Sequence, residues 1–232
     1  MSPELIIYIA TLVALVLATV AQIKVSTTFS RYSRTPTATN RTAEEVARMI
    51  LNNNGLSDVR IERVRGTLSD HYDPRSNTLR LSDSVYGNRS AAAIGVAAHE
   101  AGHAIQYARG YAPVVLRSKM VPITSFASRF TWILIILGII ISSFAAILGY
   151  YIIHIGIALF ALTTLFQLVT LPCEFDASKR ALREMENTGL YSRGELAVSR
   201  KVLSAAAMTY VAALLVSVLQ LVRLLLSASR RR

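Results

Sequence analysis

Residues 99–103 form the string His-Glu-Ala-Gly-His. Residues four apart share one face of an α-helix, so His99 and His103 can bind the same Zn²⁺ ion. Glu100 is then within reach of a water molecule on that metal. The chain has only four histidines, and two fall in this frame. The spacing predicts a zinc-dependent hydrolase with Glu100 as general base; two histidines hydrogen-bonded within an ordinary helix are the alternative.

The motif lies in a stretch of small and apolar residues without proline, residues 91–108, which predicts a single helix. Ser90 is the expected N-cap, and Gly110 is the expected C-terminal stop. Gly95 and Gly102 each cost a helix about 1 kcal/mol relative to alanine. We therefore expect close packing, or space beside a metal, at both glycines.

A catalytic zinc site usually has three protein ligands and a water molecule. Glu174 and Asp176 follow directly after a long apolar segment. A chain that crosses a membrane twice returns to the side where it began, so this segment brings Glu174 back to the side of His99 and His103. We expect Glu174 to be the third ligand, and Asp176, two positions away, to hydrogen-bond a ligand.

Other side chains remain candidates. His71 lies upstream in a turn-rich segment and could stabilise an oxyanion, bind the metal or cap a turn; Tyr72 is a second candidate for the oxyanion. The remaining candidates for metal binding or polar support are Asp70, Asp73, His154 and Cys173. A lone buried cysteine and a packed intramembrane histidine are the simpler interpretations of the last two.

Hydrophobic residues make up 53% of the chain and are gathered in long segments. Residues 5–23 suffice to cross a hydrocarbon core of ~30 Å. Residues 131–171 contain no charged side chain and predict two spans, which we expect to turn near Gly149. Residues 202–226, interrupted only by Arg223, are a fourth candidate, with a surface helix as the alternative.

The fold class predicted is a mostly α-helical membrane protein, with three to four transmembrane helices and a small α+β, zincin-like catalytic unit. The expected parts begin with an anchor at 1–24, which lacks the basic start of a signal peptide, and the catalytic unit with the motif helix at 25–130. A transmembrane hairpin follows at 131–171, and then a helix with the third ligand at 172–201. The last part is a transmembrane or interfacial helix with a basic tail at 202–232.

Basic residues indicate the orientation. Of the 25 Lys and Arg residues, 21 lie in 24–130 and 172–204, and the positive-inside rule places these segments on the cytoplasmic side of the cell membrane. The three arginines at 230–232 conflict with this if all four segments cross. We attribute the net charge of +11 to contact with lipid headgroups and expect no nucleic-acid partner. The single cysteine excludes an intrachain disulfide and agrees with a reducing compartment.

The segment before the motif predicts α+β structure. A capping box at Thr42–Glu45 begins a helix that should end near Gly55, and alternating residues predict strands at 59–66 and 77–82. We expect the second strand to be an exposed edge that binds an extended substrate peptide, and its candidate residues are Asn77, Leu79 and Leu81. A solvated edge without a ligand is the alternative.

The strings GTLSDHYDP, NTLRLSDSVY, AAHEAGHAIQ and LPCEFDASKRA resemble the neutral zinc metallopeptidase family of bacterial membranes, the YugP-like group. The chain is more distantly similar to membrane gluzincins such as the heat-shock membrane protease and the CAAX prenyl protease. The resemblance implies one zinc per chain, held by His99, His103 and Glu174, with Glu100 as the base. The aspartate of the gluzincin Glu-x-x-x-Asp motif falls on Ser178, and this departure leaves that position without an assigned role.

The predicted function is a membrane-embedded zinc metalloendopeptidase that acts on a protein or peptide. Zn²⁺ lowers the pKa of a bound water, and Glu100 takes its proton and passes it to the leaving amine. The alternatives are an intramembrane site-2-type protease, with residues 91–108 as a span, and a non-catalytic zinc-stabilised membrane scaffold. The chain has no GxxxxGK[ST] loop, so ATP hydrolysis is not expected to drive the reaction. Oligomeric state has no signature in the sequence.

Overall fold

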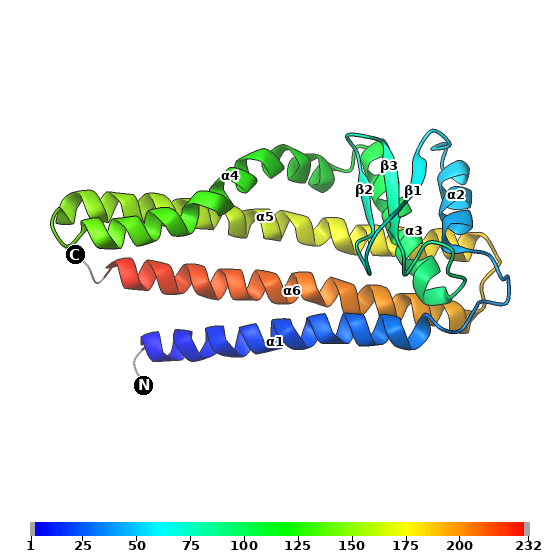
Figure 1. Cartoon of the computed structure of the whole chain (residues 1–232), viewed down its shortest axis with the longest axis horizontal. Helices are drawn as coiled ribbons and strands as arrows, with labels where there is room; N and C mark the ends of the chain where they lie inside the picture. The colour runs from blue at the N-terminus through cyan, green and yellow to red at the C-terminus, as the bar shows by residue number, and fades with distance from the viewer. Residues whose placement is uncertain (1–2, 230–232) are drawn as a thin grey trace. The chain divides into compact units, whose positions relative to one another are not determined.

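The computed structural model describes residues 3–229, with side chains from residue 5 onward (Figure 1). The elements, in chain order, are α1 (Pro3–Tyr32), α2 (Ala43–Asn53), β1 (Arg60–Val64), β2 (His71–Asp73), β3 (Thr78–Ser82), α3 (Ala91–Ala108), α4 (Ala112–Ile141), α5 (Ala146–Asn187) and α6 (Arg193–Ser229). The prediction of a mostly helical chain with a small α+β part is confirmed.

The chain divides into two compact units. The apolar unit comprises the residues up to Val20, Leu116–Leu171 and those from Tyr210 onward; the α+β unit comprises Ala21–Val115 and Pro172–Thr209. Residues 116–130 thus belong with the apolar helices, and not with the predicted catalytic segment 25–130. The reason is local: α4 is continuous from Ala112, so the chain has no break at residue 131.

Four helices, α1, α4, α5 and α6, are long and apolar enough to cross a membrane. These include residues 202–226, the fourth span of the sequence prediction. The expected turn near Gly149 is wrong, because the chain reverses at residues 142–145 and Gly149 lies inside α5. Ser142 and Ser143 donate their hydroxyls back to the Gly138 and Ile140 carbonyls, where α4 ends.

Glycines allow α4 and α5 to pack closely within the apolar unit. A Cβ atom at Gly138 would lie 2.8 Å from the backbone nitrogen of Ile153, and one at Gly156 would lie 3.2 Å from the backbone nitrogen of Ile135. Small residues at helix contacts are typical of membrane helix pairs, since apolar side chains gain little by leaving lipid. A Cβ at Gly149 would likewise lie 2.6 Å from the Gly138 carbonyl oxygen, so Gly149 serves helix packing and does not mark a turn.

The α+β unit contains a three-stranded sheet in the order β1-β3-β2. β3 pairs in parallel with β1, with Ile61 opposite Leu79, and antiparallel with β2, with Tyr72 opposite Leu79. The strands β1 and β3 match the sequence prediction. β2 was not predicted, because it has three residues and lies in a segment dominated by turn formers.

β3 is the central strand, so the prediction that it forms an exposed edge is wrong. Leu79 and Leu81 are fully buried in the core, because both faces of this strand are covered. Asn77 precedes the strand and uses its side chain locally: its Oδ1 accepts from the Tyr72 hydroxyl, and its Nδ2 donates to Asp58. These three residues therefore do not offer an open edge to a peptide, and the edge position beside α3 belongs to β2.

The helix α3 lies in the main core of the α+β unit, with α2, β3 and the first part of α6 packed around it. The Ser90 side chain accepts a hydrogen bond from the Ala93 amide, as expected of an N-cap, and Gly110 has a φ of +59° after the helix end. Gly95 and Gly102 are packing positions, as predicted. A Cβ at Gly95 would lie 2.9 Å from the Ser199 Cβ.

Replacing Gly102 by alanine tests this packing. The new Cβ would lie 2.7 Å from the Ala177 carbonyl oxygen, a backbone atom that moves only if α5 shifts away from α3. We expect Gly102→Ala to destabilise the chain by about 1–3 kcal/mol, the usual cost of overpacking. Gly194→Ala is the matched control, since its Cβ would meet only the Ser192 hydroxyl at 3.9 Å. Thermal unfolding in detergent measures both; equal midpoints would contradict the close contact.

Candidate metal centre

Two histidines of α3 and one glutamate of α5 form the only group of metal-binding geometry among the described residues. One ligand atom from each of His99, His103 and Glu174 lies within 4.8 Å of the others. The Glu174 Oε2 atom is 3.3 Å from the Nε2 of His99 and 3.5 Å from that of His103. Glu174 is 3% exposed. The structure therefore brings together the three ligands that the sequence predicts.

Gln106 orients the His103 ring. Its Nε2 donates to the Cys173 carbonyl oxygen at 2.7 Å and to the Asp176 carboxylate at 2.9 Å. Its Oε1 therefore faces His103 and accepts from Nδ1 at 2.9 Å. This leaves the lone pair of the His103 Nε2 directed at the site, as a metal ligand requires.

Asp176 contacts this amide and, within the described residues, makes no hydrogen bond to a histidine, so it is one residue removed from the ligands that it was expected to hydrogen-bond. Its Oδ2 also accepts from the Arg180 guanidinium at 2.6 Å. A role for Gln106 was not predicted from the sequence, although its position in the helix is a signal. It lies three residues after His103 on the same helix face, where a polar side chain in an apolar helix needs a partner.

Ser178 orients the other histidine. Its hydroxyl oxygen lies 3.1 Å from the His99 Nδ1, so the ring can donate there and present Nε2 to the site. The sequence left this position without a role, because serine stands where the resemblance has aspartate. In the structure this position has a role, because the Ser178 hydroxyl, one helical turn after Glu174, reaches His99.

The donor set fits zinc. Tetrahedral zinc with bonds of 2.0–2.1 Å holds neighbouring ligand atoms about 3.4 Å apart, close to the two nitrogen–oxygen distances here. Two neutral imidazoles and one carboxylate are a common zinc set, and three protein ligands leave the fourth position for water or substrate. A buried carboxylate also needs a compensating positive charge, which a bound metal ion would supply.

Glu100 lies beside this group without belonging to it. It is 8% exposed, and its Oε2 accepts a hydrogen bond of 3.1 Å from the Tyr72 backbone amide of β2. The bond connects the residue after the first histidine with the edge strand of the sheet. A carboxylate next to a histidine of this group has the chemistry that proton transfer to or from a water molecule requires.

The other sequence candidates lie outside this metal-binding group. The His71 ring lies on β2 with its Nδ1 2.9 Å from the Ser69 carbonyl oxygen, and His154 makes the same kind of contact with Tyr150. The Asp70 carboxylate accepts from the Ser82 amide and hydroxyl. None of the following is part of the metal-binding group in the described residues: His71, Asp70, Asp73, Cys173 and His154.

Burial acts on the ionisation of His103. Desolvation lowers its pKa, but the hydrogen bond to Glu174 and the charges of Glu100 and Glu174 outweigh burial, so the pKa lies above its ordinary value. Zinc binds the neutral imidazole, so metal and proton compete for this ring. The same carboxylates that favour the proton also favour a metal cation.

The metal-binding group predicts which substitutions remove zinc. We expect near one zinc per chain in the wild type and a loss of most of it in Glu174→Ala, because two imidazoles alone make a weak site. Glu186→Ala, which removes an exposed carboxylate from the same helix, is the control. Elemental analysis of detergent-purified protein measures both. Equal zinc in wild type and Glu174→Ala would remove Glu174 from the site.

Ser178 predicts a smaller effect. Ser178→Ala removes the partner of the His99 Nδ1 but no ligand, so zinc should still bind, with affinity lowered about 10–100-fold. Competition with a chelator of known affinity measures this change. Ser128→Ala, an exposed serine of α4, should bind zinc as the wild type does. Unchanged affinity in Ser178→Ala would show that the hydroxyl does not orient the ring.

Comparison with known proteins agrees with this geometry. Residues 7–229 match the family described as "Putative neutral zinc metallopeptidase". The chain is 46% identical over 213 residues to the "Putative membrane protease YugP" of Bacillus subtilis (strain 168), covering 92% of each chain. No solved structure matches the chain. With both histidines and Glu174 inside the matched residues, the chain belongs to this zinc metallopeptidase family.

Proposed function

We propose that the chain is a membrane-anchored zinc metalloendopeptidase of the gluzincin type. The observation that carries this proposal is the group of His99, His103 and Glu174, with Glu100 held beside it by the Tyr72 amide. One zinc ion per chain completes the site. The match to a zinc metallopeptidase family supports the metal and the reaction class.

Bound zinc supplies a Lewis acid that polarises a water molecule and the substrate carbonyl. Glu100 takes the proton of the attacking water and delivers it to the nitrogen of the leaving amine. Its bond to the Tyr72 amide limits its rotation. Gln106 and Ser178 keep both imidazoles with their Nε2 atoms toward Glu174.

β2 is the element that would align a peptide. It is an edge strand, antiparallel to β3, and its Tyr72 amide points away from β3 to Glu100. Because the Tyr72 amide is already bonded to Glu100, an extended substrate would pair with this edge through the outward Tyr72 carbonyl oxygen, which brings its backbone next to the general base. This assigns to β2 the role that the sequence had predicted for β3.

The oxyanion of the reaction needs a donor. The Tyr72 hydroxyl already donates to Asn77, and burial raises the pKa of this phenol, so it stays protonated at neutral pH. The exposed His71 ring lies on the same edge strand. Of the two predicted donors, we therefore favour His71 for this role.

Two alternatives are less well supported. A site-2-type protease would carry its motif on a membrane helix, whereas α3 packs in the core of the α+β unit against α2 and β3. A structural zinc site would have four protein ligands, but the described residues offer three. We propose that the α+β unit faces the cytoplasm at the cell membrane and acts on protein substrates near its surface, as the distribution of basic residues indicates.

The proposal predicts that Glu100→Gln abolishes proteolysis and leaves zinc in place. Glutamine keeps an oxygen acceptor for the Tyr72 amide but cannot take a proton, so peptide cleavage should fall by about 10²–10⁴-fold. Cleavage of an unfolded protein such as casein by reconstituted enzyme, together with zinc content, measures both effects. The control is Glu186→Gln, an exposed glutamate of α5.

The outcomes separate the alternatives. Lost cleavage with full zinc supports Glu100 as the base. Cleavage that persists in Glu100→Gln would contradict its role, and a zinc-loaded wild type without any proteolytic activity would favour the scaffold.

A further inference from the structure

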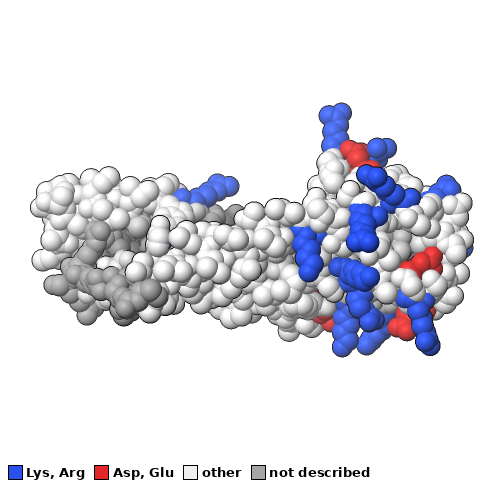
Figure 2. Space-filling view, turned by 90° about the horizontal axis from the view of Figure 1, so that it is seen from below, with Lys and Arg blue, Asp and Glu red and all other residues white. Residues whose placement is uncertain are grey.

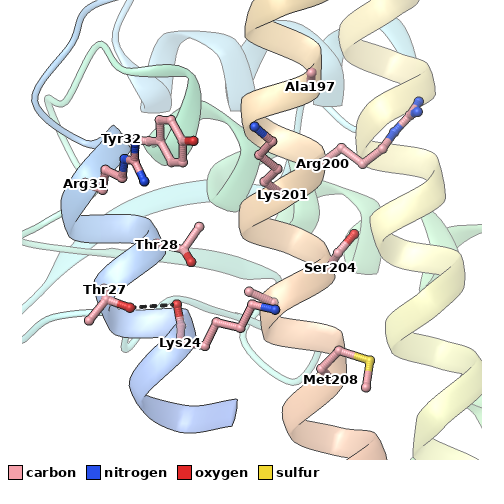
Figure 3. A pocket seen from close by; sticks show the side chains of 11 residues that line it. Lys24, Thr27, Thr28, Arg31, Tyr32, Ala197, Arg200, Lys201, Ser204 and Met208 are labelled. Carbon is pink, nitrogen blue, oxygen red and sulfur yellow. Dashed lines mark hydrogen bonds between the residues drawn. The ribbon is translucent and has the colours of Figure 1, made fainter. Parts of the chain in front are cut away.

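A groove of about 650 Å³ lies between α1 and α6 in the α+β unit, and it shares no residue with the metal centre. Residues at helical spacing line it: Lys24, Thr28 and Tyr32 from α1, and Ala197, Lys201 and Ala205 from α6. In Figure 3, the Lys24 and Lys201 side chains extend from the two helices into the space between them, and Arg31 lies at its end beside Tyr32. Arg200 also lines the groove, but its guanidinium extends away from α1.

The groove is basic, and its cations lack acidic partners. Among the described residues, no carboxylate lies within ion-pair distance of Lys24, Arg31 or Lys201. Glu195, the acidic residue of α6, is occupied by the Ser192 and Ala38 amides. Lys and Arg side chains are also scattered over the α+β unit in Figure 2. Here, however, three of them converge on one concave space, which favours a bound anion.

An aromatic ring fixes two of the cations. The Arg31 guanidinium carbon lies 5.6 Å from the centre of the Tyr32 ring, and the Lys201 amine lies 5.7 Å from it. A cation held over an aromatic face is positioned without losing its charge. The Thr28 hydroxyl, in the middle of the groove, adds a donor of the kind that binds phosphate oxygens.

The place of the groove along its helices indicates the source of the anion. Lys24 is the first charged residue after the apolar segment 5–23 of α1, and Lys201 is the last charged residue before the apolar segment of α6. Apolar segments of this kind end at the boundary between the hydrocarbon core of the membrane and the lipid headgroups. Both lysines thus mark the depth at which lipid phosphates lie.

We propose that this groove binds the headgroup of an anionic phospholipid. Lys24 and Lys201 contact the phosphate from opposite walls, Thr28 donates to a phosphate oxygen, and the acyl chains leave along the apolar segments. A phosphate with net negative charge is preferred over a zwitterionic headgroup, because the groove offers cations and no carboxylate for a choline group.

Native mass spectrometry of the delipidated, full-length chain tests the proposal, with phosphatidylglycerol compared with phosphatidylcholine of the same acyl chains. We expect the wild type to bind phosphatidylglycerol more tightly than phosphatidylcholine. The double variant Lys24→Gln/Lys201→Gln should bind phosphatidylglycerol about 30-fold more weakly than the wild type, from ~1 kcal/mol for each of the two lost cations. Arg65→Gln/Arg75→Gln removes the same charge from exposed positions outside the groove and should bind as the wild type does.

The zinc content of each variant shows that it is folded, and this readout is independent of proteolysis. Equal phosphatidylglycerol affinity in the wild type and in Lys24→Gln/Lys201→Gln would overturn the proposal. So would equal affinity of the wild type for the two lipids. A third arm adds inorganic phosphate or glycerol 3-phosphate at millimolar concentration. Displacement of the lipid by either would show a soluble phosphate ligand and overturn the assignment to the membrane.

Discussion

The buried carboxylate of Glu174 is the constraint on which the α+β unit depends. A charge that is 3% exposed costs free energy unless a partner compensates it, and here the Nε2 atoms of His99 and His103 are directed at it. To bring these groups together, α5 has to lie directly against α3. Gly102 makes this approach possible, because its missing side chain leaves room for the Ala177 carbonyl one turn beyond Glu174.

The hydrogen bonds around the site also follow from the position of the Glu174 carboxylate. Each imidazole must keep Nε2 toward Glu174, so each Nδ1 needs a fixed partner. Ser178 serves His99, and Gln106 serves His103. The second contact continues through Asp176 to Arg180, whose guanidinium also lies 5.7 Å from the Tyr111 ring. The metal-binding face of α3 is thereby fastened to the part of α5 that carries the third ligand.

Much of this site could be predicted from the sequence, because its chemistry is local. Histidines four apart on a helix share a face whatever surrounds them, and a hairpin must return Glu174 to its starting side. The partners of the histidines were harder to see. Gln106 has a spacing signal, but the role of Ser178 depends on the angle at which α5 crosses α3, which no local pattern contains.

The sheet shows the same division between local and tertiary information. Alternation at Leu79 and Leu81 indicated a strand with one apolar face, and that strand exists. Alternation does not say which strands are neighbours, so the central place of β3 and the edge place of β2 came only with the structure. The turn expected near Gly149 failed for the same reason, because close packing of α4 against α5 decides that glycine's position.

X-ray absorption spectroscopy at the zinc edge of the purified, zinc-loaded chain tests the central claim most directly. A site made by His99, His103 and Glu174 predicts a first shell of nitrogen and oxygen only, at about 2.0–2.2 Å, with two imidazoles. A sulfur atom at about 2.3 Å would instead place Cys173 on the metal, and a shell with a third imidazole would place a further histidine there. Either result would contradict the two-histidine, one-glutamate centre.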